Sequence, residues 1–314
     1  MHLPAFLPSD RPFLPINLGG NPFGWTADRD ATYAVLDRFL EGGGSFVATA
    51  DAYSSWVDGH EVCEAERLIG DWMRERGNRD RGVVATKVCR KPGREGLAHD
   101  NVVAALEESL ERLGTDRIDL YYAHYDDETV PVADQVATFS SLVASGKVRA
   151  VGLSNFSPER MRAWFETARE LGLAVPQAIQ PRYTLVSREV YERDYAPIAA
   201  EFGAAVFSYP ALASGFLTGK YRTEADFEGA ARGSAARRYA EAGGLAVVDA
   251  LVQVGERHGA EPATVALAWL LAKGVTAPIA SVSRPEQLDA ILAAPSMTLS
   301  PQDVAELDEA SAGF

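Results

Sequence analysis

Short apolar runs alternate with amphipathic stretches along the whole chain. The apolar runs are expected to be buried strands, because a strand covered on both faces carries few polar residues. These predicted strands begin near Ile16, Phe46, Val83, Leu120, Ala150, Ala178, Ala205 and Thr276. Between them, apolar residues recur at steps of three and four, which is typical of a helix with one buried face. These predicted helices begin near Arg29, Glu61, Asn101, Val132, Pro158, Glu189 and Gly244.

Two helix starts carry a clear local signal. Ser157-Pro158 and Ser300-Pro301 each place a capping hydroxyl before a proline at the first helical position. The second pair predicts an additional helix at the C-terminal end of the chain.

Eight strands separated by helices predict an α/β protein, a closed parallel (β/α)8 or TIM barrel that comprises residues 1–314 as one domain. An open doubly wound sheet is the alternative. One connection is unusually long: residues 209–243 contain five glycines and a basic cluster in an otherwise acidic chain. Such a connection is usually functional, so we expect a lid that covers a cofactor; a surface loop with solvated arginines is the alternative. The basic residues are Lys220, Arg222, Arg232, Arg237 and Arg238.

Composition narrows the possible partners and the compartment. The 314 residues are 47% hydrophobic and 24% charged, which is ordinary for a globular protein. A net charge of −14 argues against nucleic acid and acidic membrane surfaces as partners, so an anionic ligand would need a local basic pocket. Cys63 and Cys89 form no disulfide framework and have no metal-binding spacing, which predicts a reducing, cytoplasmic location and no metal site. The apolar N-terminal run is broken by four prolines and lacks a basic region, so we interpret it as a mature terminus.

Candidate chemistry lies at the ends of four predicted strands. Tyr53 follows the second strand, Lys87 and His124 end the third and fourth, and Ser154-Asn155 end the fifth. Carboxyl ends of parallel strands share one face of a barrel, so these side chains are expected to meet. Separately, each has an ordinary structural interpretation: a rim tyrosine, a surface lysine, a core histidine. Together they predict a site that protonates a carbonyl oxygen.

Tyr53 is the predicted proton donor. A phenol with a pKa of about 10 is a weak acid at neutral pH unless a neighbouring cation stabilises the phenolate. Lys87 is the candidate cation, and His124 can donate a hydrogen bond to the same carbonyl oxygen.

These strand ends resemble the motifs of the aldo-keto reductase family, especially the branch of larger bacterial members related to potassium-channel β-subunits. The resemblance covers the chain in order from about Leu18 to Ala294. It is carried by Leu18-Gly19-Gly20-Asn21, Thr49-Ala50-Asp51-Ala52-Tyr53, Ala85-Thr86-Lys87, Leu120-Tyr121-Tyr122-Ala123-His124, Gly152-Leu153-Ser154-Asn155-Phe156 and Gly215-Phe216-Leu217-Thr218-Gly219-Lys220-Tyr221. No Gly-x-Gly-x-x-Gly follows a strand, which counts against a Rossmann dehydrogenase.

The resemblance implies a (β/α)8 barrel that binds NADP(H) and delivers hydride to a carbonyl, with Tyr53 as general acid. It implies that Ser154, Asn155 and Gln180 hold the nicotinamide carboxamide and that Tyr209 stacks on the nicotinamide ring. The pyrophosphate would be lined by Leu212, Ser214, Gly215, Leu217 and Lys220. The 2′-phosphate would lie on Ser283 and Arg284, at a helix start with a predicted Ser283–Glu286 capping box, and Gln287 would lie on the adenine side. Arg284 is the reason to expect NADP rather than NAD.

The chain departs from the family pattern at three places. The family has an aspartate five residues before the tyrosine, where it pairs with the lysine; here that position is Ala48. Without this carboxylate, a buried Lys87 is expected to have a lowered pKa and to stabilise tyrosinate less, which weakens the proton relay. Val62 and Cys63 replace small glycines beside Tyr53. Ala290 and Ile291 replace a glutamate and an asparagine at the adenine end.

The predicted function is NADPH-dependent reduction of a small-molecule carbonyl, which could be an aldehyde, a ketone or a keto-sugar. Trp25, Trp56 and Tyr125 follow strand ends and are expected to form an apolar wall for it, unless they only pack under the loops. A nicotinamide-binding partner protein with little turnover is one alternative. A lyase that forms a Schiff base through Lys87 is another, because it would use a desolvated amine.

Overall fold

The computed structural model describes residues 4–7, 12–57, 59–60 and 62–314. Eight parallel strands form one curved sheet at the centre of the molecule. In chain order they are β1 (Asn17–Gly19), β2 (Phe46–Ala48), β3 (Val83–Val88), β6 (Leu120–Ala123), β7 (Val151–Ser154), β8 (Ala178–Gln180), β9 (Ala205–Val206) and β10 (Ile279–Ala280). The prediction of eight parallel strands is therefore confirmed.

The strand order identifies the type of sheet. Each strand pairs with the next along the chain, and the last strand, β10, pairs with the first, β1. At the remaining gap, Thr276 N donates to Val206 O over 2.9 Å and Ile279 N donates to Ser208 O over 2.9 Å. A doubly wound sheet would instead reverse its order at a switch point. The arrangement is consistent with a (β/α)8 barrel.

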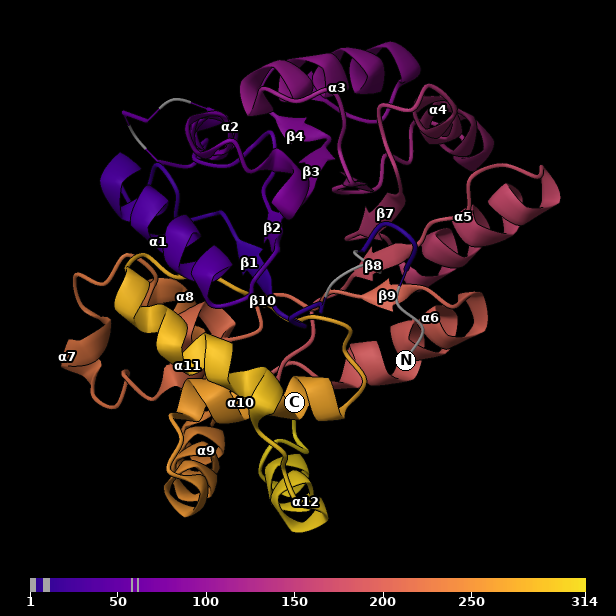
Figure 1. Cartoon of the computed structure of the whole chain (residues 1–314). Helices are drawn as coiled ribbons and strands as arrows, with labels where there is room; N and C mark the ends of the chain where they lie inside the picture. Colours follow the sequence, from indigo (N-terminus) through magenta and orange to yellow (C-terminus); the bar gives the residue numbers. More distant parts are fainter. Residues whose placement is uncertain (1–3, 8–11, 58, 61) are drawn as a thin grey trace.

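Helices surround the strands (Figure 1). Those that follow β1 to β8 are α1 (Arg29–Glu41), α2 (Glu64–Arg76), α3 (His99–Leu113), α4 (Val132–Ala144), α5 (Pro158–Glu170) and α6 (Ala196–Phe202). The C-terminal part adds α9 (Leu245–His258), α10 (Pro262–Ala272), α11 (Leu288–Ala293) and α12 (Pro301–Ala310). Ser157 and Ser300 cap α5 and α12 by accepting hydrogen bonds from the backbone N–H groups of Arg160 and Asp303, which confirms both predicted starts.

Several details differ from the expected pattern. The predicted helix start at Glu61 lies outside the described residues, and α2 begins at Glu64. The helix expected near Glu189 does begin there, but a π-helical turn, Tyr191–Tyr195, interrupts it before α6. The sequence pattern missed α10, which is almost wholly buried and therefore shows no polar face. It also missed the two-stranded hairpin of β4 (Arg90–Lys91) and β5 (Arg94–Glu95).

The segment 209–243, predicted as a long loop, is folded. It contains a 3₁₀ segment, Ala213–Thr218, and the short helices α7 (Glu224–Phe227) and α8 (Gly233–Glu241). Phe227 stacks on Tyr221 with ring centroids 5.0 Å apart. The segment therefore has its own packing and is not a bare surface loop.

The barrel interior is filled mainly by small residues. Ala48, Ala85, Ala150, Ala178, Ala205 and Ala277 are buried there with Phe46, Leu120, Tyr122 and Phe207. At the N-terminal ends of the strands, Phe6 closes the barrel, since its ring centroid lies 6.3 Å from those of Phe46 and Phe207. This end is therefore sealed by aromatic packing. In the described ranges, no helix has the length and apolar character required to cross a membrane.

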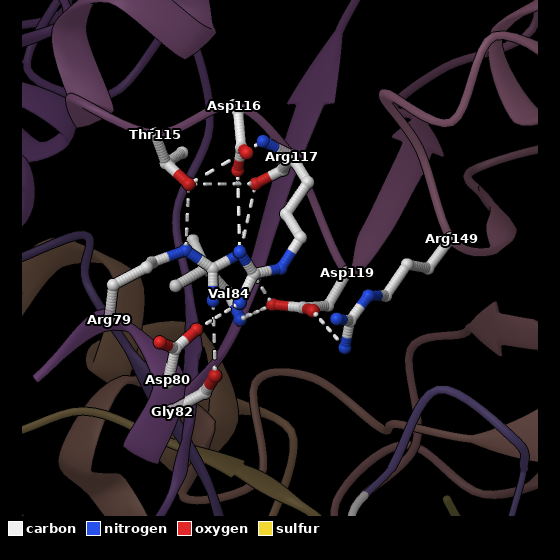
Figure 2. Close-up of polar contacts among 9 residues, drawn as sticks. All are labelled: Arg79, Asp80, Gly82, Val84, Thr115, Asp116, Arg117, Asp119 and Arg149. Carbon is white, nitrogen blue, oxygen red and sulfur yellow. Dashed lines mark hydrogen bonds and ion pairs between the residues drawn. The ribbon is translucent and has the colours of Figure 1, made fainter.

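A buried carboxylate also ties this closed end together (Figure 2). Asp119, just before β6, accepts hydrogen bonds from Arg79 Nη2 over 2.8 Å and from Val84 N over 2.9 Å. Arg149 Nη1 lies 3.1 Å from its other oxygen. The side chain of Asp119 is only 1% exposed, yet two guanidinium groups compensate its charge. The network joins the strand starts of β3, β6 and β7.

Candidate active site

Three predicted side chains converge at the open end of the barrel. Lys87 Nζ donates a hydrogen bond to Tyr53 Oη over 2.8 Å, and the rings of Tyr53 and His124 are 6.4 Å apart. Parallel pairing of β2 with β3 and of β3 with β6 brings the carboxyl ends of these strands together. A phenol, an ammonium and an imidazole from distant parts of the chain therefore occupy one place.

Lys87 has no carboxylate partner at position 48. Ala48 is buried, and the second hydrogen bond of Lys87 Nζ goes to the backbone carbonyl of Thr49 over 2.7 Å. Burial lowers the pKa of Lys87 to about 7, with Asp51 and Glu66 acting weakly in the opposite direction. At neutral pH this amine therefore holds its proton far less firmly than an exposed lysine does.

Among carboxyl groups, Asp51 has the largest effect on the pKa of Lys87, but the two side chains form no ion pair in the described ranges. Its side chain is fully buried, and neither carboxyl oxygen has a hydrogen-bond partner among the described residues. Burial, followed by the charge of Glu66, raises the pKa of Asp51 to about 8. Glu66 itself is satisfied by Thr86 Oγ1 and by Arg112 Nε. Asp51 is therefore mainly protonated at pH 7.

His124 stays neutral at this site. Burial, then the charges of Lys87 and Arg90, lower the pKa of His124 well below its usual value. Its Nδ1 is buried without a hydrogen-bond partner in the described part of the chain. A buried N–H without an acceptor costs more than a bare lone pair, so the proton is assigned to Nε2. His124 then presents a donor on the other side of its ring.

The ends of β7 and β8 carry a connected polar group. Asn155 Nδ2 donates to His124 O over 2.9 Å and to Ser154 Oγ over 3.0 Å. Ser154 Oγ in turn donates to Gln180 O over 2.9 Å. Tyr209 Oη makes a short hydrogen bond to Asn155 Oδ1. Gln180 Nε2 is buried without a well-formed hydrogen bond among the described residues, and Tyr122 Oη is the group beside it that can accept one of its protons, which leaves the other N–H for a ligand.

A cavity of about 960 Å³ extends from Tyr53 along the 209–243 segment. Ten predicted site residues line it: Tyr53, Gln180, Tyr209, Leu212, Ser214, Gly215, Lys220, Ser283, Arg284 and Gln287. Ala290 and Ile291 also line it, as expected for the adenine end. Leu217 does not, because its side chain is fully buried in the core. Ser154 is likewise buried and could reach a ligand only through the amide group that it supports.

Three cations face this cavity, namely Lys220, Arg232 and Arg284. In the described ranges none of them has a carboxylate within ion-pair distance. Burial, then Arg232 and Arg284, lower the pKa of Lys220. Arg232 lies over the Trp25 ring at 5.3 Å. The sequence analysis assigned Arg232 only to the basic cluster of the lid. A basic cluster in an otherwise acidic chain was the signal that could have placed this arginine at an anion-binding site.

The predicted capping box at Ser283 is wrong. Gln287 Oε1, not Glu286, accepts from the backbone N–H groups of Ser283 and Arg284, over 2.9 and 3.2 Å. Residues Pro285–Gln287 form a 3₁₀ turn before α11. Ser283 Oγ lies 2.6 Å from Thr26 Oγ1. Gln287 therefore shapes this turn, and Ser283 contacts the β1–α1 connection.

Cys63 supports the backbone beside Tyr53. Its N–H donates to Tyr53 O over 3.1 Å, and its Sγ lies 2.9 Å from Asp51 O. The residue has φ +70°, a conformation that favours glycine. Val62 is half-buried, and its carbonyl accepts a hydrogen bond from Arg67.

Aromatic side chains surround the open end. Trp25 and Trp56 are 6.0 Å apart, and Trp56 lies 5.8 Å from Tyr53. Tyr125 lies 5.1 Å from His124 on the other side. Trp56 is 49% exposed and Tyr125 is 36% exposed, so both have surface free for a ligand.

Comparisons with known proteins agree with this geometry. The family model described as the aldo/keto reductase family matches residues 15–312. The aldo-keto reductase YhdN of Bacillus subtilis is 30% identical over 300 residues, which cover 93% of this chain and 86% of that protein. An aryl-alcohol dehydrogenase (NADP+) of Phanerodontia chrysosporium is 30% identical over 326 residues, covering 94% and 82%. A putative voltage-gated potassium channel subunit beta of Schizosaccharomyces pombe is 30% identical over 253 residues, covering 76% and 72%. The chain therefore belongs to the aldo/keto reductase family, a family of oxidoreductases.

Proposed function

We propose that this protein is an NADPH-dependent carbonyl reductase built on a closed, single-domain (β/α)8 barrel. The observation that carries the proposal is the hydrogen bond from Lys87 Nζ to Tyr53 Oη, at one end of a long cavity. The same cavity is lined by three cations that have no ion pair among the described residues. A proton donor and a phosphate-binding surface then share one cavity. Two buried free cysteines agree with a cytoplasmic location.

The residues of the cavity fit NADP(H). Lys220, Arg232 and Arg284 repel one another, and phosphate groups would neutralise them. Gly215 allows close approach, since its φ is +86° and a Cβ there would lie 3.1 Å from Lys220 Nζ. We assign the pyrophosphate to Lys220 and Arg232, and the 2′-phosphate to Arg284. Gln180 Nε2 and the Asn155 amide would hold the carboxamide, and Tyr209 would stack on the nicotinamide.

The protein's own part in the reaction is proton transfer. Bound in this cavity, NADPH would supply a hydride to the carbonyl carbon. Tyr53 Oη donates its proton to the carbonyl oxygen, which leaves an alcohol and a tyrosinate. His124 Nε2–H donates a hydrogen bond to the same oxygen and orients it. The protonated form of Lys87 stabilises the tyrosinate, which afterwards takes its proton from solvent.

The alanine at position 48 weakens this relay. Burial raises the pKa of Tyr53, and the charge of Arg232 opposes the shift only in part. Tyr53 is thus a neutral phenol at pH 7, as reduction requires. The opposite reaction, alcohol oxidation, requires tyrosinate, and a Lys87 whose pKa is lowered gives tyrosinate little support. We therefore propose reduction as the favoured direction at neutral pH.

An aromatic carbonyl compound is the substrate that the rim favours. Rings at Trp25, Trp56 and Tyr125 border the reacting groups, and aromatic surfaces stack on one another. One relative is named an aryl-alcohol dehydrogenase (NADP+), which supports the same substrate class and the same cofactor.

The test is steady-state oxidation of NADPH with a panel of aromatic and aliphatic aldehydes, and with NADH in parallel. We expect turnover with aromatic aldehydes and a preference for NADPH. Arg284→Gln should reduce that preference about tenfold or more through KM for NADPH, because a charge-assisted contact to the 2′-phosphate is lost. Tight NADPH binding without turnover on any carbonyl would refute the reductase proposal.

That negative result would favour a second candidate, a nicotinamide-binding partner protein with little turnover. Ala48 supports this candidate, because it weakens the proton relay without altering the cavity. Relatives named as potassium channel β-subunits support it too. The lyase alternative is disfavoured: Lys87 is 1% exposed and lies behind Tyr53, so a substrate carbonyl cannot reach its amine.

A further inference from the structure

Arg90 stands at the open end of the barrel, on the hairpin that follows β3. Its guanidinium carbon lies 4.6 Å from the ring centroid of Tyr125, and the residue is otherwise exposed. Burial has the largest effect in lowering the pKa of His124, and the charges of Lys87 and Arg90 follow in that order. Arg90 therefore lies within electrostatic range of the reacting groups, without touching them.

The other cations of this hairpin are engaged. Lys91 and Arg94 both bind Glu108. Burial alone would raise the pKa of Glu108, but its hydrogen bonds from Lys91 and Arg94 lower it to about 2. Arg90, by contrast, has no carboxylate within ion-pair distance in the described part of the chain. Glu95 is its cross-strand neighbour in the hairpin, but the Glu95 carboxylate accepts a hydrogen bond from Gly93 N over 3.0 Å. In a protein of net charge −14, an arginine without an ion pair beside the mouth is a local attraction for an anion.

The aromatic side chains lead from Trp25 to this arginine without a break. Successive ring distances are 6.0 Å from Trp25 to Trp56, 5.8 Å to Tyr53, 6.4 Å to His124 and 5.1 Å to Tyr125. The Arg90 guanidinium lies over the Tyr125 ring in a cation–π contact. Among the described residues its N–H edges have no hydrogen-bond partner, and they match the two oxygens of a carboxylate. A flat substrate lying along this row would present its far end to Arg90.

We propose that Arg90 is an anion-binding residue of the substrate site, and that the substrate is an aromatic aldehyde or ketone with a carboxylate on the side of the ring opposite the carbonyl. This deepens the proposed reductase function and rests on it for the chemistry, but the binding step can be measured alone. Lys220 and Arg284 are assigned to the cofactor cavity. Arg232 lies over the Trp25 ring at 5.3 Å, so it is the competing cation at the other end of the row, and a substrate anion bound there would be insensitive to Arg90→Gln.

The kinetic test compares 4-carboxybenzaldehyde with 4-formylbenzamide, which has the same shape but no charge. We expect the wild-type kcat/KM to favour the carboxylate about tenfold or more, and Arg90→Gln to remove that preference by raising KM for the carboxylate alone. Arg94→Gln is the matched control: it lies on the same hairpin but is bound to Glu108, and it should keep the preference. Equal kcat/KM for the two aldehydes in the wild type, or an unchanged preference in Arg90→Gln, would overturn the proposal.

A binding test separates this inference from the reductase proposal. Quenching of tryptophan fluorescence would follow 4-(hydroxymethyl)benzoate and 4-(hydroxymethyl)benzamide, with and without NADP+. Tighter binding of the benzoate, lost in Arg90→Gln and kept in Arg94→Gln, supports the anion site even if no aldehyde is reduced. Equal affinities for the two compounds would overturn it even if aldehydes are reduced.

Discussion

The two ends of the barrel differ in whether their buried ionisable side chains have ion-pair partners. At the closed end, Asp119 is surrounded by Arg79, Arg149 and a backbone N–H (Figure 2). At the open end, Lys87 has only a hydroxyl and a backbone carbonyl, and the buried carboxyl of Asp51 has no hydrogen-bond partner in the described ranges. Ion pairs compensate the buried charge at the closed end, although burial lowers the pKa of Arg79 there too. At the open end Asp51 and Lys87 form no ion pair among the described residues, and burial raises the pKa of Asp51 and lowers that of Lys87.

This difference indicates what each end does. A compensated ion pair holds its geometry and keeps its charge, which suits a network that joins strand starts. Uncompensated groups with a pKa near 7 or 8 change protonation easily, which suits proton transfer. In (β/α)8 barrels generally, the carboxyl ends of the strands carry the active site, and the opposite end contributes to stability. Substitutions at the two ends should therefore have different readouts.

The largest expected effect is at Tyr53. Tyr53→Phe should lower kcat for aldehyde reduction about 10²–10⁴-fold, because the general acid is removed. The Kd of NADPH, measured by fluorescence titration, should stay within about twofold, since only a hydroxyl is lost. Tyr33→Phe is the control, because its hydroxyl binds Glu75 on the outer helices. A Tyr53→Phe protein with undiminished kcat would contradict the assignment.

The next effect is at the closed end. Asp119→Ala should reduce the free energy of unfolding by about 3–5 kcal/mol, because it leaves Arg79 buried without its carboxylate. Urea denaturation measures it, and kcat per folded molecule should not change. Asp80→Ala removes an exposed partner of Arg117 and should cost at most about 1 kcal/mol. Similar losses in the two variants would show that the network around Asp119 is not special.

Lys87→Met should have the opposite effect on stability. Folding lowers the pKa of Lys87 to about 7 from its usual value of 10.5, so the unfolded chain binds more protons between these pH values. The penalty of Lys87 is therefore full below pH 7 and disappears as pH rises toward 10.5. Replacing Lys87 should stabilise the protein by on the order of 1–3 kcal/mol at pH 6 and less at pH 9, while activity falls.

Lys91→Met is the control for that experiment, because Lys91 is paired with Glu108 and its loss should bring no gain. Urea denaturation of all three proteins at pH 6 and pH 9 measures both effects. A Lys87→Met variant less stable than the wild type at pH 6 would mean that its ammonium is better compensated than the contacts indicate.

The smallest expected effect comes from Ala48→Asp, which places a carboxylate at position 48. In the wild type, reduction should slow as pH rises through about 7, since Lys87 loses its proton there. Ala48→Asp should raise the pKa of Lys87 and move this decline upward by about one pH unit or more. Ala48→Asn has the same shape without the charge and should leave the decline in place. Identical pH profiles in all three proteins would show that position 48 does not control Lys87.

The sequence alone determined the order of strands and helices and the chemistry at the strand ends. Strands at Phe46, Val83, Leu120 and Ala178 begin where the apolar runs begin, because a strand buried on both faces leaves that pattern. Family motifs predicted that Tyr53, Lys87 and His124 meet, and the structure brings the three side chains together. Their catalytic roles and the effect of Ala48 stay predictions.

Only the tertiary structure decided which polar groups find partners. Gln287 caps the turn assigned to Glu286, Leu217 faces the core, and Arg232 enters the cavity. Arg90 has no ion pair in the described part of the chain, whereas Lys91, its neighbour in sequence, is bound to Glu108. These outcomes depend on groups far apart in sequence competing for the same space, and no local pattern records that competition. Burial then sets the pKa of Lys87 and Asp51, because desolvation is a property of the packed barrel and not of the residue type.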